Sequence, residues 1–286
     1  MAAKKSNRIK SAANKKAGAT GLPVRAIEID AYLRSLGDAK DSCEGVLFGD
    51  PHAQARGILC VWKTTTDAIE EAARQGCNVI LTHEALFDPA AEACWAPAQG
   101  QVVSFMAWKG NLARTELLIR HGITVVRSHG TADALCIQEA VMRELGFEPR
   151  AAQCLGIDLQ TADIAPTPLG ALGLRAKERL GMPAIRVAGD PALVVTRVGN
   201  GWGGLSLARH VDYLEALRLA GCQAIIAGES EEHACQYIQD AGIGLVELGH
   251  AGSENIGIKR LSLMLAGHFR AVKVGFYAIR PAFRWM

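Results

Sequence analysis

Three apolar, strand-like segments of this 286-residue sequence each lead into a histidine and a carboxylate. The pairs are His129 with Asp133, His250 with Glu254, and His83 with Glu84. In open α/β sheets, ligands bind at the carboxyl ends of the strands. Imidazole and carboxylate groups delivered together to such ends predict a metal site rather than scattered surface polar residues.

The spacing within two of these pairs favours a shared site. His250 and Glu254 are four residues apart, which places both side chains on one face if a helix begins at once. Asp133 follows His129 at the same spacing. Structural roles stay open for single residues: Asp133 can cap a helix, and Ser253 with Glu254 can begin one. His129 can also be a buried, hydrogen-bonded histidine. For the residues as a group, metal binding is the stronger prediction.

Mixed imidazole and carboxylate ligands suit Zn, Mn, Fe, Co or Ni ions. Five or six such donors exceed the four that usually close a structural zinc site. A carboxylate can bridge two ions about 3.5–4 Å apart, and such a pair lowers the pKa of a bound water. The metal-bound hydroxide would then hydrolyse an ester, an amide or a phosphoester. If His129 is not a ligand, it can serve in catalysis by transferring the proton.

Strand-like and helix-like runs alternate along the chain, which predicts an α/β protein with mixed, largely parallel sheets whose strands are buried on both faces. The pattern is less regular over residues 147–190, which are rich in proline. We place the connection between two lobes there. The predicted boundaries are a first α/β lobe over residues 23–150 and a second over residues 151–286.

The two halves of the chain resemble each other. Residues 72–86 are similar to residues 217–231, and residues 120–146 are similar to residues 240–267. In this register Glu84 matches Glu229, His129 matches His250, and Asp133 matches Glu254. Internal duplication indicates two similar α/β lobes. Their strand ends can face a common cleft that holds the metal site.

Composition excludes several classes of protein. The formal net charge is only +2, and no basic stripe is interleaved with aromatic residues, so nucleic acid is not an expected partner. No apolar run reaches the roughly 20 residues of a membrane helix.

Residues 1–20 carry six Lys or Arg and no acid, which predicts a disordered basic tail over residues 1–22 without the apolar centre of a secretory signal. Eight cysteines without a CxxC pair indicate reduced thiols in a cytoplasmic protein.

Two smaller features receive structural interpretations. Glycines 199, 201, 203 and 204 surround Trp202, but the segment lacks the full pattern of a phosphate-binding loop. A glycine-permitted turn between the lobes is the prediction. Glu229 lies at a helix start that matches the position of Glu84, so we expect it to cap the helix or to support a ligand.

Several of these motifs resemble one known family. The segments THEALF, SHGTAD, AGESEEHACQYIQDAG and, above all, GHAGSENIGIKRLS look like the Nif-three-like dinuclear-metal family, whose members are often called GTP cyclohydrolase 1 type 2 homologues. EGVLFGDP and VTRVGNGWGG resemble its two glycine-rich segments. The resemblance spans about residues 24–286, and the GHxxSE element is its most specific part.

The resemblance implies a set of metal ligands for two divalent ions, with the native metal open. They are His83, Glu84, Asp133, His250 and Glu254. Glu254 would bridge the ions, and His129 would stand behind the ligands or transfer protons. Many members have paired histidines where this chain has His83 and Glu84, and the added carboxylate favours harder ions. The resemblance also implies a homohexamer with its sites facing an internal cavity.

Three functions compete at this stage. The first is a metal-dependent hydrolase acting on a small, nucleotide-like or other substrate. The second is a metal chaperone or insertase without turnover, for which the same ligands would exchange the ion. The third is a regulatory scaffold in which the metal is structural. We favour the hydrolase. The sequence shows no feature that would recognise guanine, so GTP ring opening follows only from the name of the family.

Overall fold

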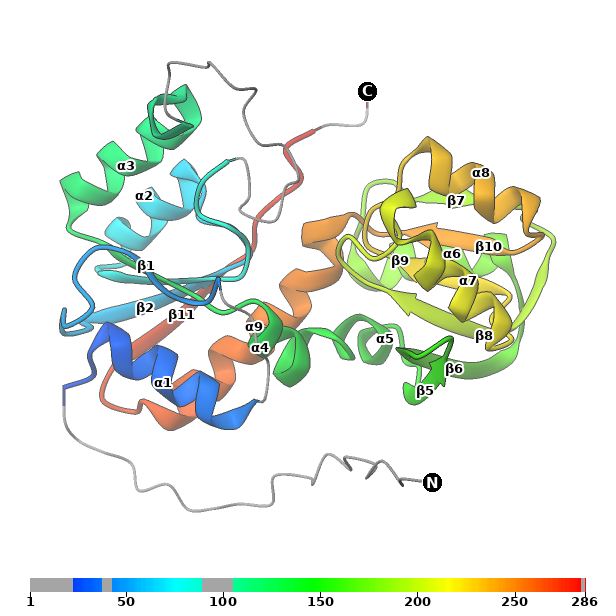
Figure 1. The fold of residues 1–286 in the computed structure, drawn as a ribbon, viewed down its shortest axis with the longest axis horizontal. Coiled ribbons are helices and arrows are strands. Elements are labelled where there is room, and N and C mark those ends of the chain that lie inside the picture. The colour runs from blue at the N-terminus through cyan, green and yellow to red at the C-terminus, as the bar shows by residue number, and fades with distance from the viewer. Residues whose placement is uncertain (1–22, 38–42, 89–104, 284–285) are drawn as a thin grey trace.

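The computed structural model describes residues 23–37, 43–88, 105–283 and 286. The basic tail predicted over residues 1–22 lies outside the described residues. The chain forms two α/β lobes, each built on one mixed sheet, and a long helix runs from one lobe into the other (Figure 1). The predicted mixed α/β class is confirmed.

The first sheet has five strands in the order β1-β4-β3-β2-β11. They are β1 (Gly45–Phe48), β2 (Gly57–Val61), β3 (Val79–Thr82), β4 (Thr124–Arg127) and β11 (Lys273–Tyr277). The strands β11, β2, β3 and β4 pair in parallel, and β1 pairs with β4 in the antiparallel direction. Every residue of β2, β3 and β4 is buried, as the continuous apolar runs predict for strands covered on both faces.

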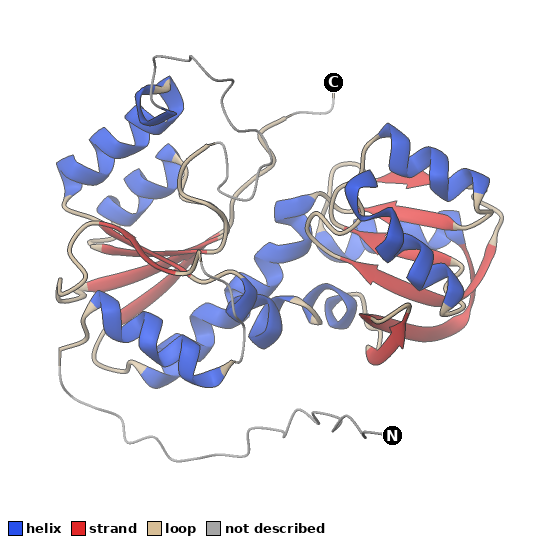
Figure 2. Ribbon diagram, in the orientation of Figure 1, coloured by secondary structure: helices blue, strands red, loops and turns tan. Residues whose placement is uncertain are grey.

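Helices cover both faces of the first sheet (Figure 2). They are α1 (Ala26–Leu36), α2 (Thr66–Arg74), α3 (Lys109–His121) and α9 (His250–His268), and a short turn η1 (Phe105–Ala107) precedes α3. Ile29 of α1 and Leu261 of α9 pack on one face, and Ile69 of α2 and Leu118 of α3 pack on the other. Successive side chains along each strand point alternately into the two cores.

The second sheet has six strands in the order β5-β6-β8-β9-β10-β7. They are β5 (Arg150–Cys154), β6 (Ile157–Pro168), β7 (Arg186–Ala188), β8 (Val194–Gly201), β9 (Ala224–Ala227) and β10 (Gly244–Glu247). Its helices are α5 (Ala140–Glu144), α6 (Leu169–Leu180), η3 (Ala208–His210), α7 (Val211–Leu219) and α8 (Glu232–Asp240). The helices α5 and α6 pack on one face, and α7 and α8 pack on the other.

The two sheets repeat one arrangement. The order β1-β4-β3-β2 in the first sheet corresponds to β7-β10-β9-β8 in the second. In both, three parallel strands are flanked by one antiparallel strand that comes first in the chain. Parallel neighbours end at the same edge, so loops after β3, β4, β9 and β10 occupy equivalent places in the two lobes.

Two helical segments cross between the lobes. The segment after β4 comprises α4 (Gly130–Ala132), the π-helical turn η2 (Asp133–Ile137) and α5. Its Ile137 lies in the core of the first lobe, whereas its Val141 lies in the core of the second. Helix α9 starts directly beyond β10 of the second sheet and buries Leu265 in the core of the first. The two segments meet where Gly257 lies against Ile137.

The division into lobes differs from the sequence-based boundary of residues 151–286 for the second lobe. Strand β11 pairs with β2 of the first sheet, and α9 packs mostly in the core of the first lobe. Local pattern identifies such a helix and strand but not the sheet that they join, because that choice depends on contacts distant in sequence. The less regular stretch after residue 147 forms β5 and β6, an antiparallel pair at the edge of the second sheet.

Other expectations concern cysteines and membranes. Cys60, Cys77 and Cys222 are buried free thiols that pack with apolar side chains. Among the described residues, no helix combines the length and the apolar character needed to cross a bilayer.

The close approach of the two crossing segments gives a stability prediction. A Cβ on Gly257 would lie 2.5 Å from Ile137 Cα, so Gly257→Ala should push α9 and η2 apart. We expect a loss of about 1–3 kcal/mol in the free energy of unfolding, measured by urea denaturation. Gly267 lies in the same helix, is exposed and has open space around it. Gly267→Ala should therefore stay within about 1 kcal/mol of the wild type, on the stabilising side. Equal effects of both variants would contradict the crossing as a packing constraint.

Candidate functional site

The six residues singled out in the sequence converge at the strand ends of both lobes. His83 and Glu84 follow β3, His129 and Asp133 follow β4, and His250 and Glu254 occupy the first turns of α9. These residues form three groups, and within each group the potential ligand atoms lie within 4.8 Å of one another. They are His83 with Glu84 and His129, His83 with Asp133 and Glu254, and Glu84 with His250 and Glu254.

His83 lies at the centre of the cluster and is 1% exposed. Its Nδ1 is 3.2 Å from the carbonyl oxygen of Ser128, so Nδ1 is the donor. Its Nε2 is buried without a hydrogen-bond partner among the described residues, 3.4 Å from Glu254 Oε2 and 3.9 Å from Asp133 Oδ1. Burial alone would lower the pKa of His83, but the Glu254 and Asp133 carboxylates raise it above its ordinary value. The position favours a positive charge.

His250 is surrounded by carboxylates. Its Nε2 lies 3.1 Å from Glu84 Oε1 and 3.4 Å from Glu254 Oε2, and its Nδ1 lies 3.0 Å from Glu229 Oε1. Burial works against the imidazolium, but hydrogen bonds with Glu229, Glu254 and Glu84 raise the pKa of His250 to about 12. For Glu84, burial is likewise overcome, and its pKa falls to about 2 because His250 donates to it. Glu229 thus supports a candidate ligand, as expected.

Asp133 and His129 form the more open side of the cluster. Burial raises the pKa of Asp133, although His83 nearby opposes the shift. Asp133 Oδ2 is 4.0 Å from His129 Nδ1, and the His129 ring stacks on His83 with centroids 4.5 Å apart. With 29% of its side chain exposed, His129 is the most accessible of the six. It therefore combines contact with the cluster and contact with solvent.

The glycine-rich segment after β8 lies directly against the candidate residues. Gly203 has a φ of +56°, a conformation that favours glycine, and a Cβ there would overlap Glu254 Oε1. The Gly203 N–H donates to Ser253 Oγ at 3.0 Å, which ties this turn to the first turns of α9. The predicted glycine turn is confirmed, and its conformation brings backbone close to a candidate ligand.

A family model described as Duf34/NIF3 (NGG1p interacting factor 3) matches residues 29–282. The chain belongs to the NIF3 family. The resemblance seen in its motifs is therefore confirmed. The chain is 25% identical over 236 residues to a Clostridium acetobutylicum protein named GTP cyclohydrolase 1 type 2 homolog, covering 78% of this chain and 81% of the relative. A Pseudomonas aeruginosa protein of the same name is 24% identical over 257 residues, covering 85% and 91%.

Solved structures share the fold of this NIF3 protein. A Bacillus cereus protein related to NIF3 has a TM-score of 0.74 at 12% identity, covering 93% of this chain and 100% of its own. A hypothetical protein from Staphylococcus aureus has a TM-score of 0.72 at 16% identity, covering 92% and 100%. At these identities the likeness establishes the fold alone.

The backbone of the site in this NIF3 protein is held by residues that the sequence did not single out. Glu44, at the start of β1, accepts hydrogen bonds from the His129 and Thr131 backbone N–H groups, both at 2.8 Å. The buried Arg127 donates through Nε to the His83 carbonyl oxygen at 3.0 Å. These contacts fix the loops after β3 and β4, which carry four of the six candidate residues.

Two tryptophans were also missed as parts of the site. Trp62 Nε1 donates to Glu254 Oε2 at 2.7 Å, and Trp202 Nε1 donates to Asp133 Oδ1 at 3.1 Å. Each directly follows a strand, Trp62 after β2 and Trp202 after β8, and this shared placement is the signal that could have identified them.

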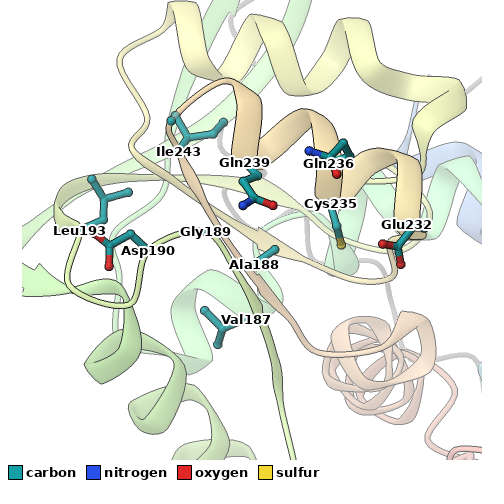
Figure 3. Close-up of a pocket in the computed structure, with 11 residues that line it drawn as sticks. Val187, Ala188, Gly189, Asp190, Leu193, Glu232, Cys235, Gln236, Gln239 and Ile243 are labelled. Atoms are coloured by element: carbon teal, nitrogen blue, oxygen red, sulfur yellow. The ribbon is translucent and has the colours of Figure 1, made fainter.

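A separate pocket lies on the second lobe, away from these residues. It has a volume of about 400 Å³ and lies between β7 and α8 (Figure 3). Its lining includes Asp190, Glu232 and Cys235, but none of the six candidate residues. The five other histidines of the chain also stay outside the three ligand groups found in the described part of the structure: His52, His121, His210, His233 and His268.

The charge arrangement predicts how acid affects the metal-free protein. Glu84 has a pKa of about 2 in the folded protein, whereas an unfolded Glu has a pKa of about 4.3. Its ionised carboxylate therefore stabilises the fold at pH values above about 4.3. This contribution disappears as the pH falls through the folded pKa. With a chelator present, the difference in melting temperature between wild type and Glu84→Gln should be largest at about pH 5–6 and should shrink toward about pH 2. A difference that grows on acidification would contradict the assignment. Glu70→Gln, which alters an exposed carboxylate on α2, serves as the control.

Proposed function

We propose that this NIF3 protein binds two divalent metal ions in the cleft between its lobes and acts as a metal-dependent hydrolase on a small substrate. One observation carries the proposal: the buried Glu254 carboxylate lies 3.4 Å from the Nε2 atoms of both His83 and His250. A carboxylate within reach of two imidazoles can bridge two ions, each held by one of them. The two groups that share Glu254 would each hold one ion.

The residues present fit such ions. His83 Nε2 is a buried nitrogen without a hydrogen-bond partner among the described residues, and it faces two carboxylates. One ion would be held by His83, Asp133 and Glu254, and the other by Glu84, His250 and Glu254. Imidazole and carboxylate ligands suit Zn, Mn, Fe, Co and Ni. The contact of Glu84 with His250 supports Glu84 as a ligand in place of the second histidine of many relatives.

Bound ions of this kind lower the pKa of water and supply a nucleophile near neutral pH. His129 would serve the reaction by moving a proton, because it is the most exposed of the six side chains and stacks on His83. Glu229 would hold the His250 ring through its Nδ1.

Two further parts of the proposal concern organisation. The lobes would derive from an internal duplication, which the matching strand orders of the two sheets support. The family resemblance also leads us to propose a hexamer, which light scattering on the purified protein would test. Because two relatives are named GTP cyclohydrolase 1 type 2 homologues, GTP belongs among the substrates to be tried.

Elemental analysis tests the ligand set. Freshly purified wild-type protein should contain about two transition-metal ions per chain. Glu254→Gln and His250→Ala should each remove most of this metal, because Glu254 is shared and His250 lies against two other ligands. His121→Ala changes an exposed histidine of α3 and should leave the metal content unchanged. If both cluster variants retain two ions, the ligand assignment is wrong.

Turnover tests the hydrolase. The fully metallated protein should hydrolyse at least one member of a panel of phosphoesters, carboxylic esters, amides and GTP. His129→Ala should lower kcat by about 10²–10⁴-fold while the metal content stays at the wild-type level, since general acid–base groups contribute on that scale. Absence of turnover together with rapid transfer of metal to an apo-acceptor would instead identify a metal chaperone.

A further inference from the structure

Trp62 and Trp202 occupy equivalent places in the two lobes. Trp62 directly follows β2 and Trp202 directly follows β8, and these strands correspond to each other in the matched order of the two sheets. No other tryptophan among the described residues ends a strand of either sheet. The indole N–H groups are hydrogen-bond donors only, so each must find an acceptor where it is withdrawn from water.

Each indole donates to a carboxylate that enters from the opposite lobe. Trp62 of the first lobe donates to Glu254, which α9 carries from the end of β10. Trp202 of the second lobe donates to Asp133, which follows β4 of the first. The two hydrogen bonds therefore cross, and Asp133 and Glu254 are themselves matched positions of the two halves.

The environments of the two rings link them to both halves of the molecule. Trp202 packs against the apolar cores of both lobes. Trp62 lies with its ring centroid 5.2 Å from that of His250, and its carbonyl oxygen accepts from the Glu84 N–H at 2.8 Å. Both tryptophans are half-buried, and an indole N–H that is withdrawn from water generally finds a hydrogen-bond partner. Here both partners are candidate ligands of the same cluster, and both lie across the interface between the lobes.

We propose that Trp62 and Trp202 are positioning residues for the metal centre. Each indole fixes the orientation of one carboxylate supplied by the other lobe, so the geometry of the ligands depends on how the lobes are placed relative to each other. The inference rests on the proposed function, because it assigns the two carboxylates to metal ions.

Replacement of each tryptophan by phenylalanine tests this role, since the ring is kept and the N–H is lost. Metal-free wild type, Trp62→Phe, Trp202→Phe and the control Trp108→Phe would be titrated with Co²⁺. Trp108 is 40% exposed and precedes α3, away from the cluster. We expect about 10–100-fold weaker Co²⁺ binding in the first two variants, the usual scale for groups that hold metal ligands. We also expect changed visible absorption of the bound Co²⁺, which a merely structural role would not produce. Trp108→Phe should match the wild type.

The outcomes separate the two levels of the proposal. If the wild type binds no Co²⁺, the metal centre itself is wrong. If it binds and both cluster variants match its affinity and absorption, only the positioning role fails. Indole N–H resonances of ¹⁵N-labelled wild-type protein provide a measurement that does not depend on the folding of the variants. Of the five indole resonances of the chain, those of Trp62 and Trp202, assigned by triple-resonance spectra of the wild type, should shift when Zn²⁺ is added, and unchanged resonances of both would overturn the role.

Discussion

The arrangement of the two lobes depends on the contacts of the buried Glu254 carboxylate. It is 3% exposed, and a charged carboxylate so withdrawn from water is costly unless charges and donors surround it. Those partners come from different parts of the chain: Trp62 and His83 from the first lobe, and His250 from the start of α9. The carboxylate can be satisfied only when these segments meet, so the cluster and the placement of the lobes form together.

Apolar packing also connects the two lobes where α9 and the segment after β4 cross. Helix α9 leaves the second sheet and fills the core of the first lobe, while the segment after β4 leaves the first sheet and fills the core of the second. Gly257 lets the two segments touch at Ile137 because no side chain separates their backbones. Each lobe therefore contributes apolar side chains to the core of the other. The crossing brings Asp133 of the segment after β4 and Glu254 of α9 within reach of tryptophans in the opposite lobes.

The candidate residues could be identified from sequence because their signal is local. A buried parallel strand appears as an apolar run, and polar residues that directly follow such runs lie at the carboxyl-end edge of their own sheet. His83, His129 and His250 were found in this way. The pairing of β11 with β2 joins residues such as Lys273 and Gly57, and the Trp62–Glu254 hydrogen bond joins two other distant segments of the chain. No local pattern encodes such contacts. The antiparallel pair β5 and β6 was missed because its residues are mostly exposed or half-buried and lack a continuous apolar run.

The place of β11 has a consequence for synthesis of the chain. Every strand of the second sheet lies between Arg150 and Glu247, so that sheet can be completed as soon as this stretch has left the ribosome. The first sheet waits for β11, which ends at Tyr277, and its core waits for α9. The segment made first is thus finished last, and until then the edge of β2 and the face of β2 on which α9 packs stay uncovered. During translation the nascent first lobe therefore exposes an unpaired strand edge and apolar surface, which are the features that promote aggregation and chaperone binding.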